Sequence, residues 1–332
     1  MAKVLAWIRN ARHQALPQSV FPALAAVCMA RVVDGFSWGW ALCACVGVAA
    51  AHLASNLADD YADFRHNSEM IRNHLAENPL RKEKCEYLFS GAFSLKQLKG
   101  AIACFGLIAA ALALAIGLKR GLPVLYLMLA TGFLSYFYSG APLRLSYHGM
   151  GEGLIGLVFG PLLMAGVYFS ACGTWSGALL WVSIAVGLLV FNIVYTHSMM
   201  DVQADAAIGK RTLAVVFPKS SVQLFFSFLG NFLPFVLVEA GVLAGILPAV
   251  FHCVWIAFPM ALALFVLMCS HFRHPERQYR PKWWMGPMPV KQWDAIVQLQ
   301  LDAFLLRWFL ARNLTTFFCL LLMAGSLWLC RQ

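Results

Sequence analysis

Two short acidic windows, residues 55–63 and 197–205, hold the side chains best suited to chemistry in this sequence. If each window is helical, its oxygen-bearing residues recur every three or four positions and therefore share one face. These residues are Asn56, Asp60 and Asp63 in the first window and Asp201 and Asp205 in the second. Like charges at this spacing repel one another, so their placement indicates a function rather than a contribution to stability.

Carboxylate and amide oxygens favour a hard cation, and Mg²⁺ is usually held by one or two carboxylates together with the phosphates of its substrate. The five residues are therefore predicted ligands of Mg²⁺ and, through it, of a diphosphate. Three basic residues are predicted to hold the outer diphosphate oxygens, namely Arg144, Lys210 and Arg211. Asp59 and His197 are expected to support the metal ligands from behind, as polar neighbours of metal sites usually do. Alternatively, Lys210 and Arg211 do not bind phosphate and are simply the basic residues that flank a membrane helix on its cytoplasmic side.

The elements that must position these windows are membrane spans. Only 12% of the 332 residues are charged, 61% are hydrophobic and the mean hydropathy is +0.71, whereas soluble domains carry about 25% charged residues. Apolar runs long enough for about nine spans occur at 16–33, 37–58, 98–118, 121–139, 152–172, 175–199, 222–245, 248–270 and 313–330. We therefore predict an all-α, multi-pass transmembrane bundle that forms a single domain over residues 1–332. Both windows follow even-numbered spans, four spans apart, as an internal repeat of a four-helix unit would place them.

The net charge of +10 comes from basic residues whose distribution along the chain agrees with this arrangement of spans. With the N-terminus in the cytoplasm, 21 of the 25 Lys and Arg residues fall on the cytoplasmic side, as the positive-inside rule requires. The basic excess thus predicts orientation in a membrane, which we expect to be the bacterial inner (cytoplasmic) membrane, and excludes a nucleic-acid partner. Two long polar segments lie on this side: a cap loop at 59–97 and an interfacial segment at 271–312. The ten cysteines are scattered without a C-x-x-C pattern, which disfavours a zinc or redox site.

Three stretches of the chain resemble the UbiA-type intramembrane prenyltransferases. They are NLADDYAD from residue 56, YSGAP and GMGE between residues 138 and 152, and DVQADAAIGKRTLAV from residue 201. The resemblance is closest to the branch that acts on 1,4-dihydroxy-2-naphthoate in menaquinone biosynthesis. It implies that the five oxygen-bearing residues hold a diphosphate through Mg²⁺ and that Lys210 contacts phosphate. Tyr138, which opens the YSGAP turn, is expected to face the reacting carbon.

The expected function is transfer of a polyprenyl group from polyprenyl diphosphate to a small aromatic acceptor at the cytoplasmic face of the bilayer. With 1,4-dihydroxy-2-naphthoate the product would be demethylmenaquinone, with release of diphosphate and CO₂. Other acceptors of the same family stay open: 4-hydroxybenzoate, homogentisate, haem, a glycerol phosphate lipid or a chlorophyllide. A cation-coupled transporter is the alternative from another class, because intramembrane acids often mark ion paths. It is disfavoured because transport sites lie near the bilayer midplane, whereas both acidic windows lie at span ends.

Overall fold

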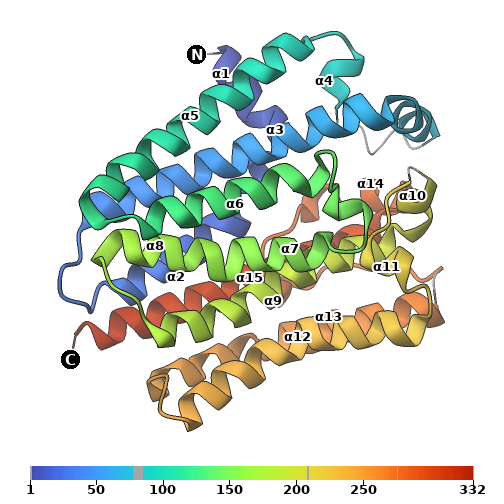
Figure 1. The fold of residues 1–332 in the computed structure, drawn as a ribbon. Helices are drawn as coiled ribbons and strands as arrows, with labels where there is room; N and C mark the ends of the chain where they lie inside the picture. The colour runs from blue at the N-terminus through green and yellow to red at the C-terminus, as the bar shows by residue number, and fades with distance from the viewer. Residues whose placement is uncertain (1, 78–84, 208, 275, 332) are drawn as a thin grey trace.

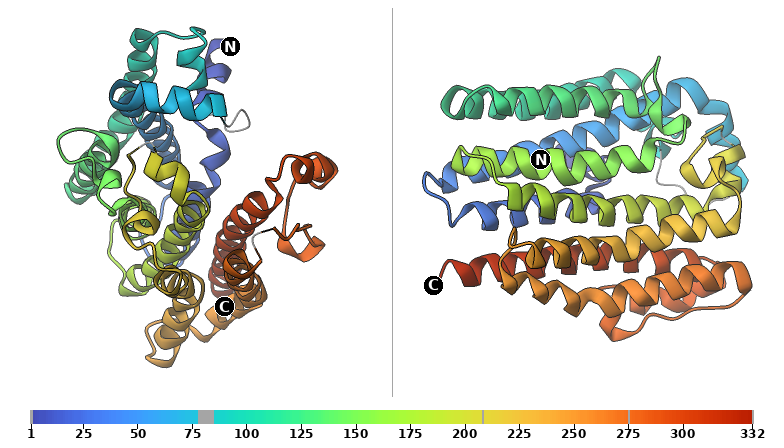
Figure 2. Two further views of the ribbon diagram at one scale, coloured as in Figure 1. Left: turned by 90° about the vertical axis from the view of Figure 1, so that its right-hand side faces the viewer. Right: turned by 60° about the horizontal axis from the view of Figure 1, so that its bottom comes forward.

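The computed structural model describes residues 2–77, 85–207, 209–274 and 276–331. Long helices run side by side in one bundle (Figure 1), as the turned views in Figure 2 also show. In chain order they are α2 (Pro17–Ala30), α3 (Trp38–Glu77), α5 (Leu95–Arg120), α6 (Pro123–Ser139), α7 (Gly151–Leu157) continued by η4 (Val158–Leu162) and α8 (Leu163–Cys172), α9 (Gly177–Met200), α12 (Ser220–Leu243), η5 (Ala249–Ala257) continued by α13 (Phe258–Arg273), and α15 (Asp302–Leu329). The short helices are α1 (Ala2–Asn10), η1 (His13–Ala15), α4 (Glu86–Phe89), η3 (Leu145–Tyr147), α10 (Val202–Ala207), α11 (Leu213–Val216), η6 (Trp283–Met285), η7 (Val290–Gln292) and α14 (Trp293–Gln298). The predicted all-α membrane fold class is confirmed.

The predicted number of nine spans is not confirmed. Within the described residues, seven helical stretches are long and apolar enough to cross a membrane, while α6 has only 17 residues and α2 has 14. A straight span needs about 20 residues, and both short helices begin at a proline, Pro17 or Pro123, which cannot continue a helix from the preceding turn. The last predicted span, 313–330, is the later part of α15, which already begins at Asp302.

Close packing of α7, η4 and α9 depends on glycines. A Cβ atom added to Gly160 would lie 2.5 Å from the Cα of Gly187 and 2.5 Å from the carbonyl oxygen of Ser183. Small residues allow membrane helices to approach in this way. Pro161 stands at the same crossing, inside the π-helical turn of η4, where a missing backbone donor is tolerated because the regular hydrogen-bond ladder is already interrupted.

We expect Gly160→Ala to destabilise the protein by about 2–3 kcal/mol, because the added methyl group meets backbone that cannot move aside. Thermal unfolding in detergent measures the effect. Gly153→Ala is the matched control on the same helix, since a Cβ there meets no atom within 4 Å. Equal unfolding temperatures for the two variants would show that this crossing does not constrain the fold.

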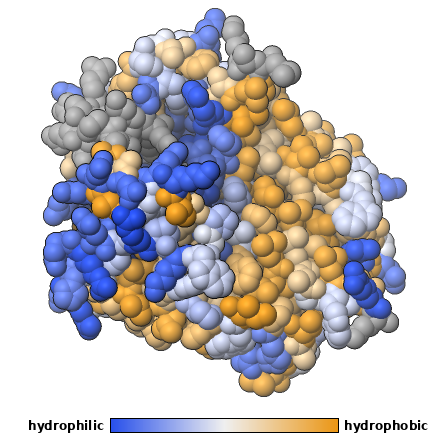
Figure 3. Space-filling view, turned by 180° about the vertical axis from the view of Figure 1, so that it is seen from behind, coloured by the Kyte–Doolittle hydropathy of each residue, from blue (hydrophilic) through white to orange (hydrophobic). Residues whose placement is uncertain are grey.

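Both acidic windows lie at one end of the bundle. Residues 55–63 belong to the second half of α3, and residues 197–205 span the end of α9 and most of α10. In Figure 1 these segments stand together at the right, next to the loop that joins α6 to α7. From behind, hydrophilic residues gather at that same end, and apolar residues cover much of the remaining surface (Figure 3). The bundle therefore presents a polar end that adjoins an apolar, lipid-compatible flank.

The two polar segments predicted as a cap and as an interfacial region contain helices of their own. Part of 59–97 continues α3 as far as Glu77 and part forms α4, while 78–84 lies outside the described residues. The segment 271–312 is fastened to the bundle by buried contacts: Arg307 donates to the carbonyl of Leu267 at 2.8 Å, and the main-chain N–H of Tyr279 donates to Asp302 at 2.6 Å. The roles of both segments stay predictions.

Candidate active site

Arg12 joins the N-terminal segment to the first acidic window. Its Nη2 lies 3.1 Å from Asp59 Oδ2 and 3.3 Å from Asp60 Oδ1, and it donates to the carbonyl oxygen of Asn56 at 2.9 Å. The Asn56 side chain in turn donates to the carbonyl of Ala11 at 2.9 Å. Burial alone would lower the pKa of Arg12, but the charges of Asp60 and Asp59 outweigh it and raise that pKa. Arg12 is therefore a permanent countercharge for this window.

Asp60 is completely buried on the side of α3 that faces α1 and α4. The hydroxyl of Tyr87 donates to its Oδ2 at 3.1 Å. Burial and the nearby charge of Asp60 raise the pKa of Tyr87, so its hydroxyl keeps its proton and stays a donor. Asp60 therefore lies between the guanidinium of Arg12 and the neutral hydroxyl of Tyr87.

Asp63 faces the loop between α6 and α7 instead. The hydroxyl of Tyr147 donates to Asp63 Oδ1 at 2.6 Å, and the guanidinium of Arg144 stacks on the Tyr147 ring, 3.9 Å from its centroid. The buried Nε of Arg144 makes no hydrogen bond within the described part of the chain. Ser139, at the end of α6, donates to Asp59 at 2.5 Å. The predicted phosphate contact Arg144 is therefore brought beside the first window by a tyrosine.

The second window is built around the end of α9. Asp201 is buried, and His197 places its Nδ1 3.3 Å from Asp201 Oδ2. The backbone N–H of Lys210 donates to the main-chain carbonyl of Asp205 at 2.8 Å, which folds the chain back over α10. Burial raises the pKa of Asp205, although the charges of Lys210 and His197 oppose that shift. Arg211, by contrast, is exposed.

Asp205→Asn should raise the unfolding temperature at neutral pH in metal-free buffer. A carboxyl whose pKa is raised by folding destabilises the folded state once it ionises, and asparagine removes that cost. Below about pH 3 the two proteins should unfold at similar temperatures, because Asp205 is then protonated in both states. Calorimetry over this pH range makes the measurement, and a lower unfolding temperature for the variant at neutral pH would contradict it.

One segment, residues 144–152, contacts the first window and the stretch of chain that follows the second window. Tyr147 binds Asp63 of the first window, as described, and buried Glu152 accepts a hydrogen bond from the backbone N–H of Leu213 at 3.0 Å, at the start of α11. Between them, the position that a Cβ of Gly149 would take lies 3.8 Å from the carbonyl oxygen of Arg211. The segments that carry the two acidic windows are therefore tied together through a common loop.

The described residues contain no group of three or more His, Cys, Asp or Glu side chains arranged to hold a metal ion. Mg²⁺ does not require such a cage, since it commonly binds one or two carboxylates and completes its shell with phosphate oxygens and water. Buried Asp63 and Asp201 supply hard oxygen donors, and the segments that carry them lie at the same end of the bundle (Figure 1). The chemistry of these donors fits Mg²⁺ in company with a diphosphate.

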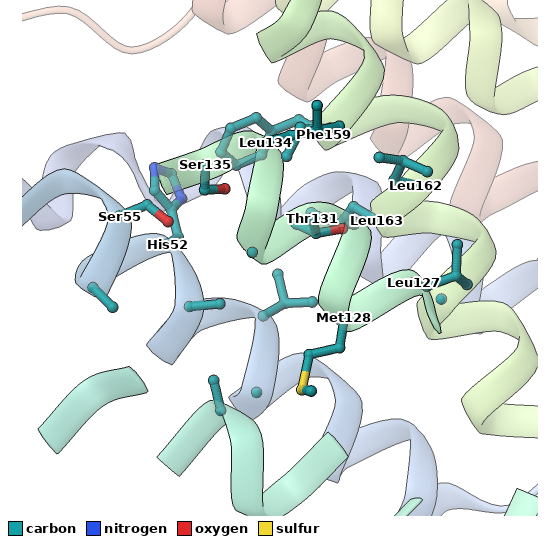
Figure 4. Close-up of a pocket in the computed structure, with 18 of the residues that line it drawn as sticks. His52, Ser55, Leu127, Met128, Thr131, Leu134, Ser135, Phe159, Leu162 and Leu163 are labelled. Atoms are coloured by element: carbon teal, nitrogen blue, oxygen red, sulfur yellow. The ribbon is translucent and has the colours of Figure 1, made fainter. Parts of the chain in front are cut away.

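A pocket of about 710 Å³ begins beside the first window and extends along the bundle between α3, α5, α6 and the α7–α8 helix. Arg12, Asn56, Asp59 and Tyr138 line it at the window end. On α3 the lining continues back to Cys43, sixteen residues or about 24 Å of helix. Figure 4 shows leucine and methionine side chains from α6, and leucine and phenylalanine from η4 and α8, facing the cavity. The pocket therefore joins a charged mouth to a long apolar interior.

Four residues of the site were missed by the sequence analysis, namely Arg12, Tyr87, Ser139 and Tyr147. Their contacts join positions 27 to 84 residues apart, so no local pattern predicts these contacts. Two signals were available: the basic first eighteen residues, which contain Arg12, and the YSGAP stretch, which contains Ser139. Of the predicted residues, the structure gathers Asn56, Asp59, Asp60 and Asp63 around Arg12 and the 144–152 loop. It gathers Asp201, Asp205 and His197 at the end of α9 with Lys210, and leaves Arg211 at the surface.

The sequence profile of the UbiA prenyltransferase family matches residues 19–290. A 2-carboxy-1,4-naphthoquinone phytyltransferase of Synechocystis sp. is 30% identical over 157 residues, which are 47% of this chain and 48% of that protein. The alignment therefore spans about half the length of that relative. A 1,4-dihydroxy-2-naphthoate octaprenyltransferase of Mycobacterium tuberculosis is 26% identical over 225 residues, 65% of this chain and 70% of that protein.

Among solved structures, a UbiA homolog from Archaeoglobus fulgidus bound to GPP and Mg²⁺ superimposes with a TM-score of 0.58. The superposition covers 93% of this chain and 98% of that one, at 17% sequence identity. At this identity the similarity establishes a shared fold.

Proposed function

The chain belongs to the UbiA prenyltransferase family, and on that premise we propose that it transfers a polyprenyl group from its diphosphate to 1,4-dihydroxy-2-naphthoate. The immediate product would be the reduced form, demethylmenaquinol, with release of diphosphate and CO₂; its oxidation to demethylmenaquinone would be a separate reaction. The observation that carries this proposal is the pocket, whose mouth has the charges for a diphosphate and whose interior has the apolar length for a polyprenyl tail. Two naphthoate-related relatives support the acceptor.

We assign Asn56, Asp60, Asp63, Asp201 and Asp205 to a Mg²⁺-diphosphate site. Mg²⁺, when bound, supplies positive charge that stabilises the leaving diphosphate. Solved relatives of this fold were obtained with Mg²⁺ and GPP, which supports the metal. The bilayer orientation belongs to the same proposal: the site faces the cytoplasm, because most Lys and Arg residues lie at that end.

The chain's own cations would hold the diphosphate oxygens that the metal does not. Arg144 offers a buried Nε without a hydrogen-bond partner among the described residues. Lys210 lies close enough to Asp205 and Glu152 for their charges to interact. Arg12 already lies at the mouth of the pocket. Preorganised positive groups of this kind favour departure of the anion, because their cost of orientation is met during folding.

The apolar pocket would keep water from the allylic carbon while the carbon–oxygen bond breaks. Tyr138 lines the cavity at the level of the first window, and its ring packs against Gly151, 3.5 Å from the position of an added Cβ. We assign its aromatic face to the reacting carbon, where it would stabilise developing positive charge. The electron-rich naphthoate ring would then attack that carbon and lose its carboxyl group as CO₂.

Transfer assays in isolated membranes test the acceptor. The protein is supplied with a polyprenyl diphosphate, Mg²⁺ and, in separate reactions, 1,4-dihydroxy-2-naphthoate, 4-hydroxybenzoate or homogentisate. We expect prenylated product only with the naphthoate, accompanied by one diphosphate and one CO₂ per product. Product formation from another acceptor in place of the naphthoate would overturn the substrate assignment and leave the prenyltransferase assignment standing.

A further inference from the structure

His52 is a buried histidine inside the pocket, 7% exposed, on the wall formed by α3. It lies one helical turn before Asn56 and two before Asp59, on the same face of the helix. Its ring packs edge-on against Phe159, with centroids 4.8 Å apart. A polyprenyl tail has no hydrogen-bonding group, so nothing in the proposed donor requires a histidine at this place.

The hydrogen bonds around His52 determine which of its nitrogens carries a proton. Nδ1 lies 2.8 Å from the hydroxyl of Ser19, and that hydroxyl donates its only proton to the carbonyl of Leu16 at 3.0 Å. Ser19 must therefore accept from the Nδ1–H of His52. In the neutral imidazole, Nε2 is then left as an acceptor. Among the described residues it has no hydrogen-bond partner.

On the pocket wall formed by α3 and α6, the hydroxyl-bearing residues lie about level with His52 or nearer the acidic window. Ser170 of α8 also lines the pocket, further from the window, but its hydroxyl already donates to the carbonyl of Gly166. The Ser139–Asp59 bond sets the register between the two helices, which run in the same direction (Figure 1). Four residues before Ser139 on α6 is Ser135, and four residues before Asp59 on α3 is Ser55. A further four residues back on α6 is Thr131, which is level with the residue next to His52 on α3. All of these line the cavity. The polar part thus extends about 12 Å from Asp59.

Beyond this level both helices present only apolar groups to the cavity, such as Met128 and Leu127 on α6 and Val48 on α3. Figure 4 shows Ser55, His52 and Ser135 on one side of the view, with Leu127, Leu162 and Leu163 on the other. Polar side chains in an apolar cavity are costly unless a partner satisfies them. Their confinement to the part nearest the acidic window indicates that the second substrate, rather than the tail, is bound there.

We propose that His52 Nε2 accepts a hydrogen bond from a ring hydroxyl of the aromatic acceptor, with Ser55, Ser135 and Thr131 around the acceptor's other oxygens. The proposal rests on the proposed prenyl transfer and identifies the chemical class of the second substrate, a hydroxylated aromatic ring. It also places that ring in the pocket itself, beside the allylic carbon. The Ser19 bond acts as a positioning contact, since it keeps Nε2 free of a proton.

Two substitutions of His52 test the roles of its two ring nitrogens separately. Asparagine places an amide near the Nδ1 position and can keep the bond to Ser19, but it has no group at the Nε2 position. Glutamine reaches the Nε2 position and offers an acceptor oxygen there. We expect His52→Asn to raise the KM for 1,4-dihydroxy-2-naphthoate about tenfold, as loss of one hydrogen bond predicts, and His52→Gln to raise it at most about threefold. The KM for the polyprenyl diphosphate should stay within about twofold in both variants.

His252→Asn is the matched control, because His252 pairs with Glu239 far along the chain, outside the pocket lining; its kinetic constants should equal those of the wild type. An unchanged acceptor KM in His52→Asn, or parallel increases for donor and acceptor in both variants, would overturn the role of His52 while the prenyl transfer stands. Absence of any transfer to this acceptor by the wild type would instead overturn the proposed function, and the role of His52 with it.

Discussion

Replacing Asp63 or Asp201 by asparagine should lower turnover about a thousandfold while the protein remains folded, since a single electrostatic group at a transition state is worth up to that factor. Both carboxylates are buried at the polar end of the bundle. Asparagine has the same shape, and its amide oxygen can still accept the hydrogen bond that Tyr147 gives to Asp63. What the substitution removes is the charge that the proposed Mg²⁺ requires. Diphosphate release in isolated membranes measures the rate.

The control is Asp294→Asn, which removes a carboxylate from an exposed ion pair with Arg280. This variant should keep the wild-type rate, because exposed ion pairs contribute little to structure and this one lies outside the site. Wild-type turnover in Asp63→Asn would exclude that residue from the metal site, and the same holds separately for Asp201→Asn. Loss of the inserted protein in either variant would show a structural role instead.

Arg12→Ala should destabilise the protein by about 3 kcal/mol, the usual effect of removing one partner of a buried ion pair. Asp60 is fully buried, and Arg12 is its cationic partner at 3.3 Å, with only a quarter of the Arg12 side chain exposed. The substitution removes this cation from beside a buried carboxylate, while the Tyr87 hydroxyl can still donate to Asp60. The unfolding temperature in detergent, measured in metal-free buffer, gives the effect.

Arg12→Lys should recover part of the lost stability, because it restores the charge without the planar guanidinium that reaches Asp59, Asp60 and the Asn56 carbonyl together. Arg280→Ala serves as the comparison: Arg280 also pairs with an aspartate, at 2.7 Å, but 71% of its side chain is exposed. Its loss should have little effect. If the alanine variants at Arg12 and Arg280 unfolded at the same temperature, the pair at Asp60 would be worth no more than a surface ion pair.

The local arrangement of each acidic window was predictable, because helical periodicity acts over a few residues. Asp60 follows Asn56 by one turn in any helix, and the high hydropathy of the preceding residues requires a membrane helix there. The geometry of the metal ligands was not predictable. Asp60 and Asp63 were expected to act on one face toward one diphosphate, yet in the structure Asp60 contacts Tyr87 and Arg12 while Asp63 contacts Tyr147. Their joint role as Mg²⁺ ligands stays a prediction.

The number of membrane spans likewise was predicted only in part from the local sequence. Hydropathy identified an apolar run at 16–33 and another at 121–139, but it carries no information on where a helix starts. α2 begins at Pro17 and already ends at Ala30, and α6 begins at Pro123, so the two helices have 14 and 17 residues. Conversely, polar residues before Asn313 concealed the first turns of α15, whose Arg307 is buried by hydrogen bonds to α13. A hydropathy value averaged over neighbouring residues cannot show that a charged side chain is buried by hydrogen bonds to another helix.

From the sequence alone, composition determined a helical membrane bundle, and motif spacing determined two acidic helical windows and the family they resemble. These properties depend on each residue and its near neighbours along the chain. Only the tertiary structure decided that Arg12 lies beside Asp60, that residues 144–152 contact both the first window and the stretch after the second, and that His52 lines the pocket with an Nε2 that has no hydrogen-bond partner among the described residues. Those contacts arise from the register between packed helices, set by residues such as Gly160 and Ser139 far away in sequence.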